Sequence, residues 1–338
     1  MNPSEPENPV TNPPATDLPE VERGDMRIGF YNVENLFDTI DDPGNSQDDE
    51  FLPGSSKNWN AERYQQKISD IGEVFRALDY PVLMGLSEVE NRGVLQDLVD
   101  SEKLRDAGYG IVHEDSPDFR GIDVALLYRK AEFSVADFTA IEVELPPSVS
   151  EFSTTRDILQ VRGTLRNEEV FLFVNHWPSR SGGVSATSGK REFAAGVLRS
   201  AIDEILLNNP DANIIALGDF NDEPYNRSLT DALQVQTQKP VMPDNQLYNC
   251  TIPFLEAGAG SYMYQGEWQM YDQLVVSGRL LDTSGTLKIL SFDILMEDFL
   301  LFDHPEDGPR PNRTYGGDNY YGGISDHLPV FLEVAIQP

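Results

Sequence analysis

Short apolar runs of strand length recur along the chain, and they limit the fold to one built on β-sheets. We predict strands over residues 26–33, 81–89, 122–129, 158–165, 170–177, 213–220, 271–278 and 328–336. Several of these runs are apolar throughout, which is typical of strands that are covered on both faces. The chain therefore needs further layers of structure outside its sheets.

Segments with helical periodicity lie between the strands. Apolar side chains recur with helical spacing in 60–78, the segment 94–108 predicts a helix that ends near Gly108, and 189–209 holds the longest helical pattern. Strands interspersed with helices predict an α/β domain in which two packed sheets are flanked by helices. The apolar stretch 287–302 predicts a pair of strands or the edge of a buried helix.

We expect a flexible tail over 1–25 and one domain over 26–338, because the chain shows no internal repeat and no strong linker after the tail. The tail is rich in Pro, Asn and acidic residues and lacks apolar periodicity. No signal peptide is visible in it. Its composition nevertheless resembles the tether that follows a cleaved signal or a lipid-attachment site. We therefore expect a protein that is secreted, periplasmic or tethered to the cell surface.

Composition excludes several classes of protein. A hydrophobic content of 39% suits a globular core rather than a disordered chain. The only cysteine is Cys250, which excludes an intrachain disulfide and a cysteine zinc cluster. No uninterrupted apolar run approaches the ~20 residues of a membrane-spanning helix. We expect a monomer without a membrane span.

The chain is strongly acidic, since 57 Asp and Glu residues against 25 Lys and Arg give a formal net charge of −32. Such a field repels polyanions and lowers their encounter rate. It argues against a tight nucleic-acid binder that relies on a basic surface. It leaves open an enzyme whose bound metal ions supply positive charge at the point of contact. Adaptation of the surface to salty or cold water is the alternative explanation for much of this acidity.

Polar side chains gather at the ends of the predicted strands. They occur in segments 31–35, 175–177 and 218–222, at Glu88 and Asp272, and in the pair Asp326-His327. The end of one strand and the start of an antiparallel neighbour share an edge, so we expect these groups to meet at one rim of the sheets. Loops at such a rim are common places for functional sites.

The residue types at this rim suit a hard divalent cation. Carboxylates are available from Glu88, Asp219 and Asp326, and amide groups from Asn32 and Asn221. Mg²⁺ and Mn²⁺ prefer such ligands, whereas structural zinc does not. Histidines beside carboxylates can act as general acids or bases near neutral pH, so the set indicates metal-assisted hydrolysis of a phosphoester. Each residue alone has an ordinary alternative as a turn residue, a helix N-cap, a strand-entry turn or a buried core histidine.

The ordered motifs of the chain resemble the endonuclease/exonuclease/phosphatase superfamily, which includes deoxyribonuclease I. The motifs that carry this resemblance are YNVENLFD, GLSEVEN, GIDVALLYRK, VNHWPSRSGG, LGDFNDEP, YDQLVVS and SDHLPV. They extend from residue 26 to about residue 336. The resemblance implies a four-layered α/β sandwich, with two packed and mainly antiparallel sheets flanked by helices, and a metal-dependent phosphohydrolase.

The resemblance also implies roles for individual residues. It assigns metal binding to Asn32, Glu34, Glu88 and Asp326, with Mg²⁺ as the expected ion and Mn²⁺ or Ca²⁺ as alternatives. Glu34 stands where many members have Asp or another polar residue. Catalysis falls to His176, Asp219, Asn221, Asp272 and His327. In this scheme Asp219 and Asn221 contact the attacking water and the scissile phosphate. His327, oriented by Asp272, is the catalytic base or a transition-state partner, and His176 donates to a phosphate or leaving-group oxygen.

Supporting residues have weaker assignments. Three arginines are candidates for holding phosphate oxygens, namely Arg120, Arg129 and Arg180. We prefer Arg180 as the substrate-binding residue because it follows the strand that ends at His176. His113 and His304 lack a matching motif and are expected to be structural, and Asp123 is expected to hold a turn.

Three functions compete. The first is an endonuclease that cleaves DNA or RNA as a transient partner, supported by the resemblance of 271–281 to deoxyribonuclease I. The second is a phosphatase or phosphodiesterase acting on a small or lipid phosphoester, for which a negative surface is no handicap. The third is a non-catalytic metal-binding module, which would require a key residue to be missing, and none is.

Overall fold

The computed structural model of the chain describes residues 23–151, 153–238, 246–282, 285–305 and 308–336. Residues 1–22 of the predicted tail therefore lie outside the described residues. The end of the tail joins a sheet. The backbone N–H of Gly24 donates to Glu333 Oε2 at 3.0 Å, and that of Asp25 donates to the carbonyl of Val334 at 2.9 Å. Residues that precede the first predicted strand thus already bond to the sheet.

The first of two large sheets has six strands, in the order β14 (Leu287–Ile294), β19 (Val330–Ile336), β1 (Met26–Leu36), β2 (Leu83–Val89), β4 (Asp123–Arg129) and β3 (Tyr109–His113). β1 and β2 are parallel, and the other neighbouring pairs are antiparallel. Phe30 of β1 lies opposite Gly85 on one side and Val330 on the other. The carboxyl ends of β1 and β2 and the start of β19 therefore share an edge.

The second sheet has seven strands, in the order β5 (Phe133–Ile141), β6 (Ile158–Leu165), β7 (Glu168–His176), β8 (Asn213–Asp219), β13 (Asp272–Ser277), β10 (Leu247–Asn249) and β9 (Val235–Gln236). The β7–β8 and β9–β10 pairs are parallel and the others are antiparallel. His176 lies opposite Asp219, and Asp219 lies opposite Asp272. The prediction of two mainly antiparallel sheets is confirmed.

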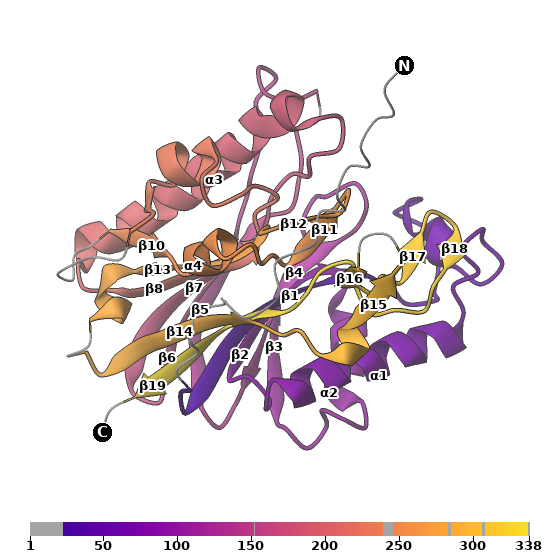
Figure 1. Cartoon of the computed structure of the whole chain (residues 1–338), viewed down its shortest axis with the longest axis horizontal. Helices are drawn as coiled ribbons and strands as arrows, with labels where there is room; N and C mark the ends of the chain where they lie inside the picture. The colour runs from indigo at the N-terminus through magenta and orange to yellow at the C-terminus, as the bar shows by residue number, and fades with distance from the viewer. Residues whose placement is uncertain (1–22, 152, 239–245, 283–284, 306–307, 337–338) are drawn as a thin grey trace, which may run out of the picture.

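Helices cover the outer face of each sheet (Figure 1). α1 (Ala61–Ala77) and α2 (Arg92–Asp100) pack on the first sheet, and α3 (Val184–Asn208) packs on the second. A short helix, α4 (Ile252–Glu256), lies between β10 and β11 in the sequence. The predicted four-layered α/β sandwich is therefore confirmed.

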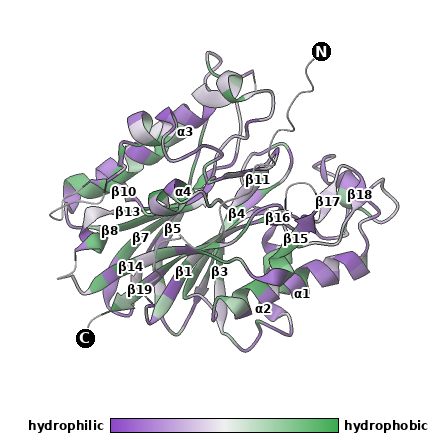
Figure 2. Cartoon of the chain, viewed as in Figure 1, coloured by the Kyte–Doolittle hydropathy of each residue, from purple (hydrophilic) through white to green (hydrophobic). Residues whose placement is uncertain are grey.

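The two sheets approach each other closely at Gly85 of β2. A Cβ atom at this position would lie 2.2 Å from Leu217 Cδ1 and 3.2 Å from Val174 Cγ1, both on the second sheet. Only glycine therefore fits here without displacing a neighbour. Figure 2 shows that hydrophobic residues dominate the central strands, whereas the helices carry hydrophilic residues as well.

Two helices differ from their predicted ranges. α2 ends at Asp100 rather than near Gly108, because the chain turns after Ser101 while Leu104 stays buried and prolongs the apolar spacing. α3 begins at Val184, earlier than the predicted start at 189. The first turn of α3 is rich in small and polar residues, so it lacks the apolar periodicity by which helices are found.

The structure contains strands that the sequence analysis missed. In the two large sheets, β3, β5, β9 and β10 were not predicted; β5 is an edge strand with mainly exposed side chains, so it shows little apolar character. The stretch 287–302 forms β14 and the start of β15, which do not pair with each other. The remaining strands form three hairpins, namely β11–β12 (Tyr262–Tyr264, Glu267–Gln269), β15–β16 (Leu301–His304, Gly308–Pro311) and β17–β18 (Tyr315–Gly316, Asn319–Tyr320). Within the described ranges no helix has the length and apolar character needed to cross a bilayer.

Candidate active site

A hollow of about 630 Å³, here termed the rim hollow, opens where the strand ends of the two sheets meet. Most of the predicted site residues line it, and these are Glu34, Glu88, His176, Arg180, Asp219, Asn221, Asp326 and His327. Asn32 and Asp272 are buried behind them and bond to Asp219 and His327. The sheets thus bring all the predicted residues together from segments far apart in the sequence.

Unusual backbone conformations are concentrated at this rim. Positive φ angles occur at Glu34 (48°), Asn35 (59°), Glu88 (61°) and Asn221 (50°). Such angles are uncommon for residues with a side chain and tend to occur at functional sites. At Glu88 the local cause is a β-bulge, since the register of β2 shifts between Ser87 and Val89. A bulge re-aims the side chain that it carries, and here that side chain reaches the rim hollow.

The Glu88 carboxylate has one fixed partner and one open oxygen. Its Oε2 accepts a hydrogen bond from the backbone N–H of Asn35 at 3.1 Å. Its Oε1 lies 3.8 Å from His176 Nε2, which is too far for a hydrogen bond. The side chain is 14% exposed. An anionic oxygen is therefore available to a ligand in the rim hollow.

The Asp219 carboxylate is held in place from two sides. Its Oδ1 accepts from the backbone N–H of Asn221 at 2.8 Å, and its Oδ2 accepts from Asn32 Nδ2 at 3.1 Å. Burial raises the pKa of Asp219 to about 6, and the neighbouring His327 charge acts in the opposite direction. Asp219 is therefore an oriented carboxylate that takes up a proton close to neutral pH.

His327 forms a buried dyad with Asp272. The two are joined by a 2.6 Å contact between His327 Nδ1 and Asp272 Oδ2. This contact leaves Nε2 facing the site, 3.8 Å from Asp219 Oδ2. Burial by itself lowers the pKa of His327, but the Asp272 and Asp219 carboxylates outweigh burial and raise it well above its ordinary value. His327 is therefore an imidazolium at neutral pH.

His176 differs from His327 in its charge. Burial, and then the nearby cations Arg156 and Arg120, hold the pKa of His176 well below its ordinary value. Its Nε2 lies 3.7 Å from Asp219 Oδ2, and its Nδ1 has no hydrogen-bond partner among the described residues. The neutral ring can therefore donate or accept a single proton toward the rim hollow.

Arg156 positions the end of β7, and the sequence analysis missed it. Its side chain donates to the carbonyls of His176 at 3.1 Å and Trp177 at 2.6 Å, and it forms a 2.9 Å ion pair with Asp118. It belongs to no motif that carries the resemblance. The one signal for it in the sequence is its place shortly before the predicted strand 158–165.

Glu34 lines the rim hollow, but backbone donors occupy its carboxylate. Its Oε2 accepts from the N–H of Thr314 at 2.7 Å, and its Oε1 accepts from the N–H of Tyr315 at 3.2 Å. Burial and the nearby Asp326 raise the pKa of Glu34 to about 7. Its position is therefore suited to joining β1 to the 314–315 segment as well as to reaching a metal ion.

Lys67 of α1 is a second residue that the sequence analysis missed. Its Nζ donates to the carbonyls of Glu34 and Ile324 and to Thr314 Oγ1. The side chain is buried, and burial lowers its pKa to about 8. Lys67 therefore joins three segments, namely the end of β1 with Glu34, the segment at Thr314 and the segment at Ile324 that leads to Asp326.

We expect Lys67→Met to lower the free energy of unfolding by about 3 kcal/mol, because it removes one partner of a buried, charged hydrogen-bond network. Urea unfolding measures this change. The control is Lys103→Met, which removes a half-exposed contact to Glu73 and is expected to cost less than about 1 kcal/mol. Equal effects of the two substitutions would contradict the prediction.

The arginines differ in how they meet the rim hollow. Arg180 lines it, donates to Asn221 O, Asp222 Oδ1 and the Tyr271 hydroxyl, and stacks 4.6 Å above the Tyr271 ring. Arg120 and Arg313 also line it. Arg313, which was not predicted, pairs with Asp326 Oδ2 at 2.9 Å. The candidate Arg129 lies at the opposite end of β4 from this edge, so it does not belong to the site.

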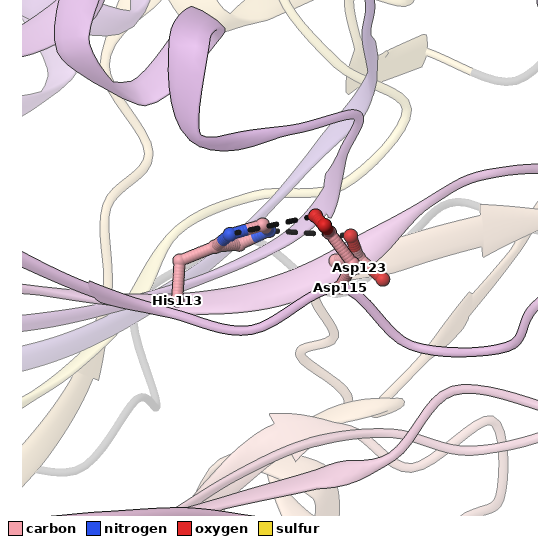
Figure 3. Close-up of side chains that lie close together, drawn as sticks. All are labelled: His113, Asp115 and Asp123. Carbon is pink, nitrogen blue, oxygen red and sulfur yellow. Dashed lines mark hydrogen bonds and ion pairs between the residues drawn. The ribbon is translucent and has the colours of Figure 1, made fainter.

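His113 and Asp123 form a separate group (Figure 3). His113 Nε2 lies 3.2 Å from Asp123 Oδ2, and His113 Nδ1 lies 3.9 Å from Asp115 Oδ1. Asp123 Oδ1 accepts from the backbone N–H of Ser116 at 2.8 Å. These contacts hold the loop between β3 and β4, as expected for structural residues. His304 lies on β15 and does not line the rim hollow.

The donor set at the rim fits a hard divalent cation. Glu88 offers an open anionic oxygen, and atoms of Asp219, Asp272 and His327 lie within 4.8 Å of one another. Asp272 Oδ1 is buried and has no hydrogen-bond partner among the described residues. Carboxylate oxygens without a cysteine favour Mg²⁺ or Mn²⁺ over structural zinc.

Comparison with known proteins identifies the family of this chain and other proteins that share its fold. The sequence model of the endonuclease/exonuclease/phosphatase family matches residues 27–336. A search of curated proteins finds no match.

Solved structures share the fold at low sequence identity. The mannosyl-6-phosphatase of Bacteroides thetaiotaomicron is 17% identical, with 91% of this chain and 99% of that chain covered and a TM-score of 0.57. The catalytic domain of human Nocturnin is 16% identical, with 92% and 94% covered and a TM-score of 0.57. Truncated TDP2 of Caenorhabditis elegans is 15% identical, with 92% and 97% covered and a TM-score of 0.54.

Proposed function

Since this chain belongs to the endonuclease/exonuclease/phosphatase family, it is a metal-dependent phosphoester hydrolase, and we propose that it cleaves phosphodiester bonds within DNA or RNA. The observation that carries the proposed chemistry is the Asp272–His327 dyad, which faces Asp219 in the same hollow as Glu88. The rim hollow is also lined by Arg120 and by tyrosine side chains of the β11–β12 hairpin. Such a surface can hold a phosphate and a neighbouring base.

Each side chain has a distinct role in the proposed reaction. Glu88 is the main metal ligand, with Asn32, Glu34 and Asp326 beside it, and bound Mg²⁺ would supply a Lewis acid for the phosphoryl oxygen. Asp219, oriented by Asn32 and Asn221, accepts a proton from the attacking water while the oxygen of that water bonds to phosphorus. The ester P–O bond breaks with its electron pair on the leaving oxygen, which takes up a proton from solvent.

The two histidines act on the oxygens of the phosphate. The His327 imidazolium donates from Nε2 to a phosphoryl oxygen, where negative charge gathers in the transition state. Neutral His176 donates to another phosphoryl or leaving-group oxygen. Arg180, which packs against Tyr271, binds a phosphate oxygen of the substrate.

We expect a bell-shaped dependence of kcat/KM on pH. Asp219 must be deprotonated to accept a proton, so the rate falls as the pH drops through about 6. A bound cation favours the charged carboxylate and moves this fall to lower pH. His327 must be protonated, so the rate falls again only above the ordinary histidine range. Initial rates across a pH series test this shape. A rate that begins to rise only where His327 loses its proton would instead make neutral His327 the base.

A plasmid nicking assay tests the substrate. With Mg²⁺ or Mn²⁺ we expect supercoiled DNA to be converted to the nicked form, and with chelator we expect no conversion, because Glu88 then lacks its ion. A matched assay uses a structured RNA. Intact nucleic acid with both metals would contradict the proposed substrate.

A small phosphoester is the second candidate substrate, and the net charge of −32 favours it, because such a field disfavours the approach of a polyanion. The likeness to a mannosyl-6-phosphatase supports this candidate at the level of the fold. Release of inorganic phosphate from a sugar phosphate, in a preparation that leaves plasmid intact, would identify this activity instead.

A further inference from the structure

A second group of carboxylates lies outside the rim hollow, in the segment 38–50 that follows β1. This segment, DTIDDPGNSQDDE, has six acidic residues and no Lys, Arg or His. It borders another hollow, of about 610 Å³, here termed the acidic hollow. Seven carboxylates line the acidic hollow without any Lys or Arg among the described residues, and they belong to Asp38, Asp41, Asp42, Glu90, Asp115, Asp118 and Asp123. The resulting field concentrates cations.

Three carboxylates of this segment are close enough to share one ion. Asp41, Asp48 and Asp49 each present an oxygen that lies within 4.8 Å of the others. Like charges at such distances repel one another, and a cation between them reverses that repulsion. Exposed acidic groups often cluster without an ion, so the group needs a second sign of a ligand.

Asp48 provides that sign. It is 2% exposed, whereas Asp41 and Asp49 are exposed. Its Oδ2 accepts from the backbone N–H of Asp42 at 2.8 Å. Its Oδ1 is buried and has no hydrogen-bond partner among the described residues. A buried carboxylate oxygen without a partner is costly and rare in native proteins, and a cation bound by this residue would satisfy it.

We propose that Asp41, Asp48 and Asp49 bind a divalent cation of the Ca²⁺ type, at a site separate from the active site. Ca²⁺ takes about 6–8 oxygen ligands in irregular geometry, which a loop can supply from carboxylates, carbonyls and water. The cluster contains no His or Cys, which disfavours zinc and copper. The neighbouring group at His113 differs, because both Asp123 oxygens already have partners.

The ion links this segment to the end of β1. The ring of Phe37, at the start of the segment, stacks 4.3 Å from that of Phe51 at its end, and Trp59 Nε1 donates to the carbonyl of Phe37 at 2.9 Å. The backbone N–H of Asp38 donates to Glu90 Oε2 at 2.7 Å. These contacts close the base of the loop, and the cation joins Asp41, near its start, to Asp48 and Asp49, near its end. The loop begins directly after β1, the strand that carries Asn32 and Glu34.

Terbium luminescence tests the site, because Tb³⁺ replaces Ca²⁺ and is excited by a nearby tryptophan, here Trp59. The full chain carries Glu88→Gln, which removes the main active-site ligand. We expect saturable luminescence that Ca²⁺ displaces. Asp48→Asn, which keeps the shape of the side chain, is expected to weaken the apparent affinity ~10–100-fold. Asp41→Asn, at an exposed position, tests the same site without altering the core.

The control variant removes equal or greater charge elsewhere. Asp106→Asn with Asp211→Asn changes two exposed carboxylates and is expected to leave the affinity unchanged. In the same Glu88→Gln background, Ca²⁺ near 100 times its Kd is expected to raise Tm by roughly 3–6 °C, and Asp48→Asn is expected to reduce this rise to about half or less. Neither readout requires catalysis, so failure of the proposed activity leaves the test intact. Equal affinity and an equal Tm rise in Asp48→Asn, Asp41→Asn and the control would overturn the proposal.

Discussion

Glu88→Gln is expected to reduce the rate of phosphoester hydrolysis by at least ~10³-fold, which corresponds to several kcal/mol of lost transition-state stabilisation. The substitution keeps the size of the side chain and an oxygen that can accept from the N–H of Asn35. It removes the anionic charge that the β-bulge of β2 presents to the rim hollow. The loss should therefore be chemical rather than structural.

The measurement is kcat/KM at saturating Mg²⁺, on whichever phosphoester the wild-type protein cleaves. Glu90→Gln is the matched control, because Glu90 follows the same strand but does not line the rim hollow. We expect the control to stay within about tenfold of wild type and both variants to unfold at similar urea concentrations. Activity of Glu88→Gln within tenfold of wild type would show that another group anchors the metal ion.

Asp272→Asn is expected to lower kcat by about 10²–10⁴-fold, the range that positioned acid–base groups contribute. The carboxylate of Asp272 lies 2.6 Å from His327 Nδ1 and keeps this buried ring charged. The substitution replaces that carboxylate with a neutral amide. The pKa of His327 then falls, so the alkaline limb of the pH profile moves to lower pH. Rates across the same pH series measure both effects.

Folding must be separated from catalysis in this variant, since Asp272 is fully buried. Breaking a buried charge pair can cost about 3–5 kcal/mol of stability, so the rate is referred to the folded fraction measured by urea unfolding. His327→Gln is a second variant of the same dyad, and Asp211→Asn is the exposed control. A normal rate with an unmoved alkaline limb in Asp272→Asn would remove the dyad from the proposed mechanism.

Much of the fold could be predicted because strands buried on both faces are apolar throughout. The runs that became β2, β7 and β8 were recognised for this reason. The edge strand β5 was missed, since its side chains are mainly exposed and a register shift between Val135 and Asp137 interrupts its pairing. The end of α2 was misplaced because Leu104, in a turn, repeats the spacing of a helix. Local sequence patterns indicate which residues are buried. They predict secondary structure wrongly where a strand is exposed or where a buried residue lies in a turn.

The sequence predicted the residues of the candidate site and their meeting at one rim, but not their charges or the contacts that support them. Polar residues at strand ends are local features, so Glu88, Asp219 and His327 could be named from the sequence. Their charges could not be assigned, because the neutral state of His176 depends on burial and on Arg156, which lies in the segment before β6.

The sequence by itself determined that strands would end in a rim of carboxylates, amides and histidines, because apolar runs and the polar residues that follow them are neighbours in the chain. Tertiary structure alone decided how those groups are supported. Glu34 receives its hydrogen bonds from Thr314 and Tyr315, and Lys67 joins the same segments. These partners are separated by most of the chain, and only the packing of the sheets brings them within hydrogen-bonding distance.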